Sequence, residues 1–550
     1  MKGLKPDVRG HLVVFATVTI GASLLYVPNF REGLPPGVDT PTFLHFSWFV
    51  EETLHGRGGL TDPYWYGGLK VFQTYPPLAY SLVGLLAYAT PLSLVVAYKI
   101  ILLTAYLGLG MATYWLALEL RADVVPAAVA AVLAITAYPV FQALGIWGWF
   151  TTLAALPLGI GSLAALERSL HYHSLRFAVM GGVLLGLSVL AHHMTAFALA
   201  LVLLVWLPVR FLTLEGKQPS FFVLVAAFAA GTAVVTIWWA IPFLFHVATA
   251  GFQREVPGLW SFSFRQYRLA VANSDLIGLY VYPTYMGFTL LVLAVGGISL
   301  SLMERGRATA YGVAALALWI FSLGAQTNPL LRIRPLDGLD VARFHLFLVP
   351  FACVLSASYL GNVWEAVSKL IQRFVRLETA RAVAAFAALG LVLAYPAYDA
   401  VRAIRSTLQP VHIDESAYAA LGWLNSAEAT SGKVLAVGWW NWDAFLVPLE
   451  TGRPVMDGWY DEGTTDWRAI REVRHMMWSG NVDVPRLCQL MVERKTKYLL
   501  VYDYYPMEHP RAFLEALRSR PDLFREMVRR EKVSIFERIG GRTRTMRATR

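Results

Sequence analysis

The sequence predicts an α-helical polytopic membrane domain over residues 1–399, followed by a soluble α/β domain over residues 400–550. The chain of 550 residues is 56% hydrophobic and 15% charged, with a mean hydropathy of +0.50. Soluble domains are nearer to about a quarter charged. Long apolar runs continue as far as residue 398, and patterns typical of soluble domains begin only after it. These observations favour a membrane bundle that carries one extramembrane domain.

A membrane-spanning helix needs about 20 apolar residues, and about eleven runs of this chain meet or approach that length. In order, these runs are 11–29, 94–118, 126–143, 151–166, 176–193, 195–212, 220–246, 279–302, 310–325, 344–366 and 382–398. One further run, 77–91, is short and ends at Pro91. Its length alone leaves open whether it crosses the bilayer.

The distribution of basic residues favours one orientation. Lys2, Lys5 and Arg9 precede the first run, so the positive-inside rule places the N-terminus in the cytoplasm. If 77–91 does not cross, the other basic clusters also fall inside, namely 121, 167–176, 210–217, 304–307 and 369–381. We therefore predict a multi-pass cell-membrane protein with about eleven spans. Segment 77–91 becomes a juxtamembrane or re-entrant helix, and the C-terminal domain is extracytoplasmic.

Beyond residue 400, helical and strand patterns alternate, which is typical of an α/β layer domain. Strands are predicted at 433–440, 453–459, 497–505 and 532–539, and helices at 416–427, 484–495 and 510–520. The chain contains no Walker A pattern, dinucleotide fingerprint, HExxH or CxxC. The net charge of +10 lies in short clusters between apolar runs, so it does not indicate a nucleic-acid partner.

The stretch 28–77, most of which lies in the first predicted outer segment, 30–93, is rich in polar, aromatic, Gly and Pro residues. Long ordered loops usually serve function, so we expect this one to cover an active site at the outer membrane surface. Asp39 follows the first span, where low-dielectric surroundings would raise its proton affinity and suit a general base. An equally compatible alternative is a helix N-cap, since Thr40 and Pro41 follow.

Three histidines are candidate supporting polar groups. His45 lies in a short helix, 41–55, for which an interfacial amphipathic helix is the favoured interpretation. His192 and His193 are adjacent at a junction of apolar helices, which indicates function because titratable groups are costly in lipid. A wet, hydrogen-bonded turn is the alternative. Aromatic residues of the first loop suit either an interface belt or stacking on sugars, and the candidates for acceptor or glycan contact are Trp65, Tyr66 and Tyr75.

The predicted outer loop 323–347 is basic, against the positive-inside rule, which makes an anionic partner attractive. Arg343 stands at the start of a span, where it could clamp a lipid-linked phosphate bidentately. The alternative is that Asp337 and Asp340 pair with these cations. The candidates for donor-phosphate binding are Arg343, His345, Arg332 and Arg334.

In the tail, residues 437–463 combine several tryptophans with acidic side chains. Such a cluster favours glycan contact, and the candidates are Trp439, Trp440 and Asp443. A packed strand end beside a solvated acidic loop explains the pattern equally well.

These motifs resemble those of a known enzyme class. A first span followed by Asp39, then WYGG at 65–68 and TYPPLAY at 74–80, resembles the GT-C class of polyprenyl-phosphate-dependent glycosyltransferases. The membrane part is also similar to archaeal membrane proteins labelled as related to 6-pyruvoyl-tetrahydropterin synthase. In the tail, GWWNWD at 438–443 resembles the WWDYG region of oligosaccharyltransferase catalytic subunits, with Asn441 at its Asp position and Asp443 at its Gly position.

The resemblance implies that a sugar moves from a polyprenyl-phosphate carrier to a lipid or protein acceptor at the outer membrane face. Asp39 would be the general base, arginines would hold the donor phosphate, and the anomeric centre would invert. The second outer loop reads GIWGWF and lacks the acidic residues of metal-dependent oligosaccharyltransferases, so a divalent metal stays open and no other cofactor is implied. The alternatives are a non-enzymatic lipid-linked glycan transporter, a polymer-secretion component, or a scaffold whose tail is the working part.

Overall fold

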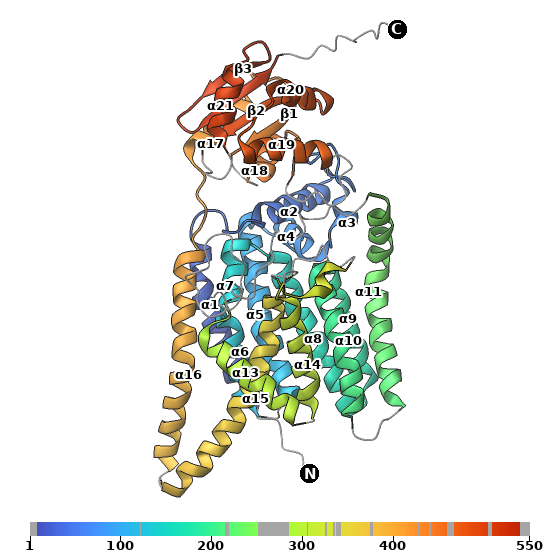
Figure 1. Ribbon diagram of the computed structural model, residues 1–550, viewed down its shortest axis with the longest axis vertical. Coiled ribbons are helices and arrows are strands. Elements are labelled where there is room, and N and C mark those ends of the chain that lie inside the picture. Colours follow the sequence, from blue (N-terminus) through green and yellow to red (C-terminus); the bar gives the residue numbers. More distant parts are fainter. Residues whose placement is uncertain are drawn as a thin grey trace.

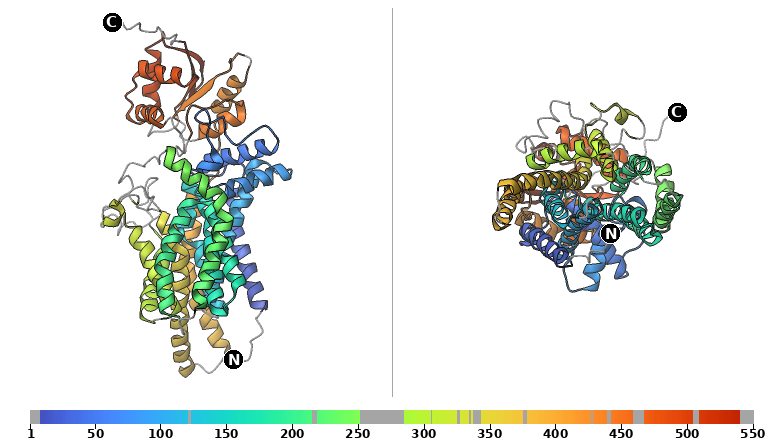
Figure 2. Two further views of the ribbon diagram at one scale, coloured as in Figure 1. Left: turned by 90° about the vertical axis from the view of Figure 1, so that its right-hand side faces the viewer. Right: turned by 90° about the horizontal axis from the view of Figure 1, so that it is seen from below.

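The structure, a computed structural model, consists of a helical bundle with a small α/β region at one end (Figure 1). The described residues are 8–120, 123–214, 219–250, 285–304, 306–324, 327–333, 336, 343–374, 378–426, 428–438, 442–458, 467–503 and 509–539. The long helix α16 (Glu378–Thr407) rises along the bundle and leads into the α/β region. The start of α1 (Val8–Tyr26) lies at the opposite end of the bundle (Figures 1 and 2).

Besides α1 and α16, the bundle is built from nine further helices among the described residues. They are α5 (Leu94–Leu120), α6 (Val124–Thr136), α8 (Phe150–Tyr172), α9 (Leu175–Ala191), α10 (His193–Leu212), α11 (Ser220–Ala250), α13 (Phe288–Met303), α14 (Arg307–Phe321) and α15 (Arg343–Phe374). Six helices in the described residues are long and apolar enough to cross a membrane. The number is seven if α6 and the bent segment that follows it count as one span. The chain is thus a multi-pass membrane protein.

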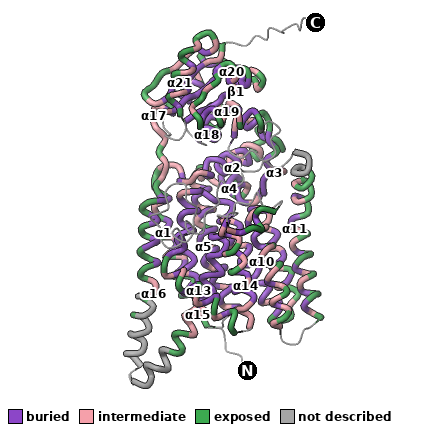
Figure 3. The backbone as a smooth tube through the Cα atoms, in the orientation of Figure 1, coloured by how far each residue is buried: buried purple, intermediate pink, exposed green. Residues whose placement is uncertain are grey.

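Surface exposure agrees with a lipid environment. Large apolar side chains point outward from the bundle, including Leu204 (71% exposed) and Val234 (77% exposed). Figure 3 shows buried residues running through the middle of the bundle and exposed ones along the outer side of α11. Contiguous apolar exposure of this kind is unusual in water-soluble proteins. The shorter apolar helices include α9, α13 and α14, so the predicted number of eleven spans goes further than helix length and composition alone show.

Small residues allow the bundle helices to approach closely. Gly182 of α9 faces the Phe228 carbonyl of α11, and a Cβ at that position would overlap it. Close contact through glycine is a recurrent way of packing membrane helices, where burial of apolar surface provides no drive. At the end of the bundle farthest from the α/β region, Arg210 of α10 donates to both carboxylate oxygens of Glu167 of α8 at 2.9–3.1 Å, with both side chains buried.

Two helices lie at the end of the bundle next to the α/β region. α2 (Thr40–Leu54) and α4 (Leu78–Ala89) pack against each other there, and Gly84 of α4 leaves room for Val50 and the Ser47 carbonyl (Figures 1 and 2). At about 1.5 Å per residue, the 12 residues of α4 span about 18 Å, well short of the roughly 30 Å hydrocarbon core. This placement agrees with the predicted juxtamembrane role of segment 77–91.

The α/β region contains one four-stranded sheet in the order β1-β2-β4-β3. β1 (Lys433–Val437) and β2 (Thr496–Tyr502) are parallel, and β4 (Val533–Arg538) pairs antiparallel with β2 and with β3 (Phe524–Arg529). The helices of this region are α17 (Glu415–Asn425), α18 (Trp442–Thr451), α19 (Trp467–Ser479), α20 (Val484–Glu493) and α21 (Pro510–Arg518).

The tail differs from the sequence prediction in two helices and two strands. The helices α18 and α19 have no counterpart among the predicted helices. The strand expected at 453–459 is reduced to a single bridge between Val455 and Val434. β3 was not predicted, because its sequence FREMVR is an edge strand without apolar alternation. The proposed domain boundary at residue 400 falls within α16, which continues to Thr407.

Candidate active site

The position of Asp39 is fixed by backbone contacts with the segment that follows α6. That segment comprises α7 (Tyr138–Phe141) and the π-helix η2 (Gln142–Trp147). The Val38 and Asp39 amides donate to the Ile146 and Trp147 carbonyls at 3.0 and 2.8 Å. Asp39 occupies the N-cap position of α2, as the alternative interpretation predicted, but its side chain makes no capping hydrogen bond. The carboxylate therefore points to other partners.

A close glycine contact supports this arrangement, and it provides a prediction. Gly148 has φ +64°, and a Cβ there would overlap Thr40 Oγ1 and lie 2.9 Å from the Thr40 amide. Gly148→Ala is expected to displace Asp39 and lower activity by up to about 10²-fold, since small misplacements of reacting groups are costly. Gly452, also at φ +64° but with nothing within 4 Å of its Cβ position, provides the matched control. Equal activity of Gly148→Ala and Gly452→Ala would contradict the prediction.

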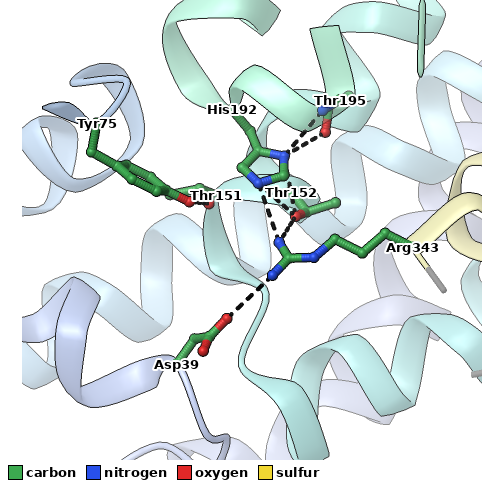
Figure 4. A network of polar contacts seen from close by, with 7 residues as sticks. All are labelled: Asp39, Tyr75, Thr151, Thr152, His192, Thr195 and Arg343. Carbon is green, nitrogen blue, oxygen red and sulfur yellow. Dashed lines mark hydrogen bonds and ion pairs between the residues drawn. The ribbon is translucent and has the colours of Figure 1, made fainter. Parts of the chain in front are cut away.

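Arg343, at the first residue of α15, approaches Asp39 from the other side of the site (Figure 4). Its Nη2 lies 3.6 Å from Asp39 Oδ2, and the two side chains are 11% and 9% exposed. The guanidinium also lies over the Trp149 ring, 4.6 Å from its centroid. Such a stack fixes the plane of the guanidinium and adds a favourable cation–π interaction. Residues 39 and 343 thus meet at the same end of the bundle.

Two side chains orient the guanidinium, Thr152 of α8 and His192, the N-cap residue of α10. Arg343 Nη1 donates to Thr152 Oγ1 and approaches His192 Nε2, both at 3.2 Å. Nε2 of His192 thus faces the guanidinium. Nδ1 is the N-cap acceptor of α10: it accepts from the Thr195 amide at 3.2 Å and lies 2.9 Å from Thr195 Oγ1 (Figure 4). These contacts fix the plane of the imidazole ring beside Arg343.

Tyr75 and His193 form the next part of the site. The Tyr75 hydroxyl lies 3.1 Å from Thr151 Oγ1, and its ring meets the edge of His193 with centroids 5.5 Å apart. Tyr75 is 3% exposed. The structure thus brings together four of the predicted residues, which are Asp39, Arg343, His192 and Tyr75, with His193 beside them.

Other predicted residues are placed elsewhere. His45 is fully buried, bonds Asp62 at 2.7 Å and stacks on Trp65 at 4.4 Å. Trp65 is also 0% exposed, so its ring offers no face to a sugar in this structure. His345 is fully buried within α15, two residues beyond Arg343, while Arg332 is exposed at the end of the 3₁₀ turn Pro329–Arg332. Tyr66 and Asp443 are mostly buried, at 8% and 6%, and Arg334, Trp439 and Trp440 lie outside the described residues.

Sequence reasoning missed Trp149, Thr152 and Thr195. Trp149 lies in the second predicted outer loop, where no role was assigned to it. Thr152 and Thr195 stand in apolar runs, where a hydroxyl carries no signal of its own. In the described part of the chain, no group of three or more His, Cys, Asp or Glu residues could hold a metal ion. The side chains around Asp39 do not form a metal site either, because the Asp39 carboxylate faces the guanidinium of Arg343.

Comparisons with solved structures show the fold class. The oligosaccharyltransferase of Archaeoglobus fulgidus matches with a TM-score of 0.58 and 13% identity, over 90% of this chain and 70% of that one. ArnT from Cupriavidus metallidurans matches at 0.56 and 14%, over 96% and 98%. The arabinofuranosyltransferase AftD from Mycobacteria matches at 0.63 and 16%, over 96% of this chain but only 40% of its own length.

No curated protein matches the sequence. The matches to solved structures show a GT-C-like fold. Because their sequence identity to this chain is low, they show the fold and not the activity or the substrate. The family description "6-pyruvoyl-tetrahydropterin synthase related domain; membrane protein" matches residues 72–403, more than half of the chain. The chain belongs to this 6-pyruvoyl-tetrahydropterin synthase related family of membrane proteins.

Proposed function

We propose that this protein is a membrane glycosyltransferase that moves a sugar from a polyprenyl-phosphate carrier to a lipid or protein hydroxyl. The observation that carries the proposal is the approach of Asp39 and Arg343 to 3.6 Å at one end of the bundle. A carboxylate that can take a proton and a cation that can hold a phosphate are the two groups that this transfer requires. The GT-C-like fold supports the same reaction class.

In the proposed mechanism, the donor phosphate contacts Arg343, whose plane Trp149 and Thr152 hold in position. Asp39 removes the proton from the acceptor hydroxyl as its oxygen attacks the anomeric carbon. The bond from that carbon to the phosphate oxygen breaks, and polyprenyl phosphate leaves with its charge stabilised by Arg343. Attack opposite the leaving group inverts the anomeric centre.

The neutral form of the His192 ring matters for this step. A charged imidazolium 3.2 Å from Arg343 Nη1 would repel the guanidinium, whereas a neutral ring leaves it in position. His192 and Thr195 thus act as positioning residues behind Arg343. His345, buried in the same helix, and the exposed Arg332 are more distant candidates for the donor side, and Tyr66, Tyr75 and Asp443 are candidates for the acceptor side.

We further propose the orientation and the span count. With Lys2, Lys5 and Arg9 in the cytoplasm and about eleven helices crossing, the site and the α/β region face the outside. The proposed division is a membrane domain over 1–399 and an extracytoplasmic domain over 400–550.

Cysteine labelling at an engineered position in α20 or α21, compared on intact and opened vesicles, tests this orientation. In inverted vesicles an outward-facing domain lies in the lumen, so a membrane-impermeant reagent is expected to label it only after the vesicles are opened. Labelling of intact inverted vesicles would contradict this orientation.

The proposed function is tested by reconstituting the protein and offering a polyprenyl-phosphate sugar with an acceptor. Sugar transfer supports the enzyme, whereas carrier movement across the bilayer without a new glycosidic bond would support the transporter alternative.

Arg343→Gln is expected to weaken donor binding by about 10- to 150-fold, because a charged hydrogen bond contributes roughly 1.5–3 kcal/mol. Arg31→Gln is the matched control, since that side chain is exposed and no role in donor binding is assigned to it. Unchanged donor binding in Arg343→Gln would contradict the assignment.

A further inference from the structure

A second polar site lies between α6, α7, α13 and α16, apart from the residues around Asp39. A small recess opens there, where α6 ends and α7 and α13 begin, against a part of α16 that lies well inside that helix. Its walls include a carboxylate, two tyrosines and two hydroxyls, namely Asp399, Tyr138, Tyr395, Thr136 and Thr289. Neither the proposed transfer nor the helix packing accounts for this set.

The carboxylate of Asp399 is the unusual member of the recess. Its residue is 2% exposed, and the Tyr285 hydroxyl donates to Oδ2 at 2.7 Å. Among the described residues, no Lys, Arg or His forms an ion pair with it. Burying a carboxylate is costly unless a cation or several donors compensate, and ionisable groups within a membrane bundle usually serve function. No cation of the described residues pairs directly with Asp399, which leaves its carboxylate accessible to the cation of a ligand.

Aromatic side chains complete a cation-binding environment. The Tyr138 and Tyr285 rings meet edge to face with centroids 5.1 Å apart, and Tyr395 forms a further wall. Tyrosine faces attract cations, and aromatic cages with a carboxylate suit ammonium groups. The recess leaves room for a group about the size of one water molecule. A primary ammonium meets this limit, while a sugar ring or a trimethylammonium group does not.

The surroundings of the recess indicate a lipid as the source of the ammonium. Tyr395 is 43% exposed and Phe288 beside it is 56% exposed, so the wall reaches the outer surface of the bundle. Arg402 follows Asp399 by three residues on α16, which places both on one helix face about 5–6 Å apart. A carboxylate and a guanidinium at this spacing match an ammonium joined to a phosphate by a short linker.

We propose that this recess binds the primary ammonium of a phospholipid head group, with Asp399 and the tyrosines holding the ammonium and Arg402 facing the phosphate. The site would tie a membrane lipid to α16, the helix that leads into the α/β region. The proposal does not depend on sugar transfer, because it concerns lipid binding alone.

The test measures binding of three lipids with identical acyl chains to the full-length protein in detergent, by native mass spectrometry. Phosphatidylethanolamine is expected to bind about tenfold or more tightly than phosphatidylcholine, which is too large, and phosphatidylglycerol, which lacks the cation. Asp399→Asn and Tyr395→Leu are each expected to abolish this preference. Tyr398→Leu, on the same helix and 61% exposed but outside the recess, is the matched control and should retain it.

Several results would overturn the proposal. Equal binding of the three lipids, or an unchanged preference in Asp399→Asn, would show that no cation is recognised and that the recess holds water only. Binding of soluble ethanolamine as tight as the lipid would identify a free amine instead of a head group. If Asp399→Asn fails to fold, the comparison of Tyr395→Leu with Tyr398→Leu decides alone.

Discussion

Asp39→Asn is expected to lower sugar transfer by about 10²–10⁴-fold, the range typical of losing a general base. The substitution keeps the shape of the side chain and the backbone bond from the residue 39 amide to the Trp147 carbonyl. Donor binding should persist or become tighter, since Arg343 would no longer face a competing carboxylate at 3.6 Å. Transfer rate and donor affinity, measured separately on the purified variant, check both parts of this expectation.

A matched control is available in the same loop. Glu32 is exposed, so Glu32→Gln removes a carboxylate from segment 28–77 without reaching the site. It should transfer sugar at the wild-type rate. Full activity of Asp39→Asn would remove Asp39 from the mechanism, and loss of donor binding together with transfer would instead indicate that Asp39 holds the structure of the site.

The sequence could predict Asp39 and Arg343 because both interrupt a local pattern. Asp39 is an acid in the polar segment that follows the first apolar run, and Arg343 is a cation that precedes a late run on the predicted outer side. Thr152 and Thr195 could not be predicted, since a threonine in an apolar helix is ordinary until its neighbours are known. Trp65 shows the opposite case, because an aromatic rim and a buried anchor have the same sequence signature.

At the level of the fold, the hydrophobic periodicity and the length of the apolar runs correctly predict the long helices and the strands β1, β2 and β4. The same local patterns give wrong predictions where contacts between distant parts of the chain determine the structure. The bend of 41° between α6 and the segment Tyr138–Trp147 leaves no break in the apolar run 126–143. The strand expected at 453–459 becomes a single bridge, because Val455 also pairs with the first outer loop through its amide and the Tyr64 carbonyl, at 2.7 Å. Non-local partners of this kind are invisible to a local pattern.

Trp65→Ala is expected to destabilise the attachment of the α/β region by about 3–5 kcal/mol, the usual cost of truncating a buried tryptophan. The Trp65 ring is 0% exposed and stacks on His45, while Nε1 donates to the Ala444 carbonyl of α18 at 2.7 Å. Gly458 allows this fit, since a Cβ there would come within 2.6 Å of the ring. Thermal unfolding and protease release of the C-terminal fragment measure the loss. Trp478→Ala, on α19 and 60% exposed, is the control and should behave like wild type.

The effects of Trp65 variants should separate packing from hydrogen bonding. Trp65→Phe keeps a ring against His45 but loses the bond to Ala444, so a smaller loss of about 1 kcal/mol is expected. Because this contact joins the outer loop that positions Asp39 to the α/β region, Trp65→Ala should also reduce sugar transfer, whereas Trp65→Phe should largely preserve it. If Trp65→Ala unfolds and transfers like Trp478→Ala, the contact does not hold the two parts together, and the α/β region has no part in forming the site.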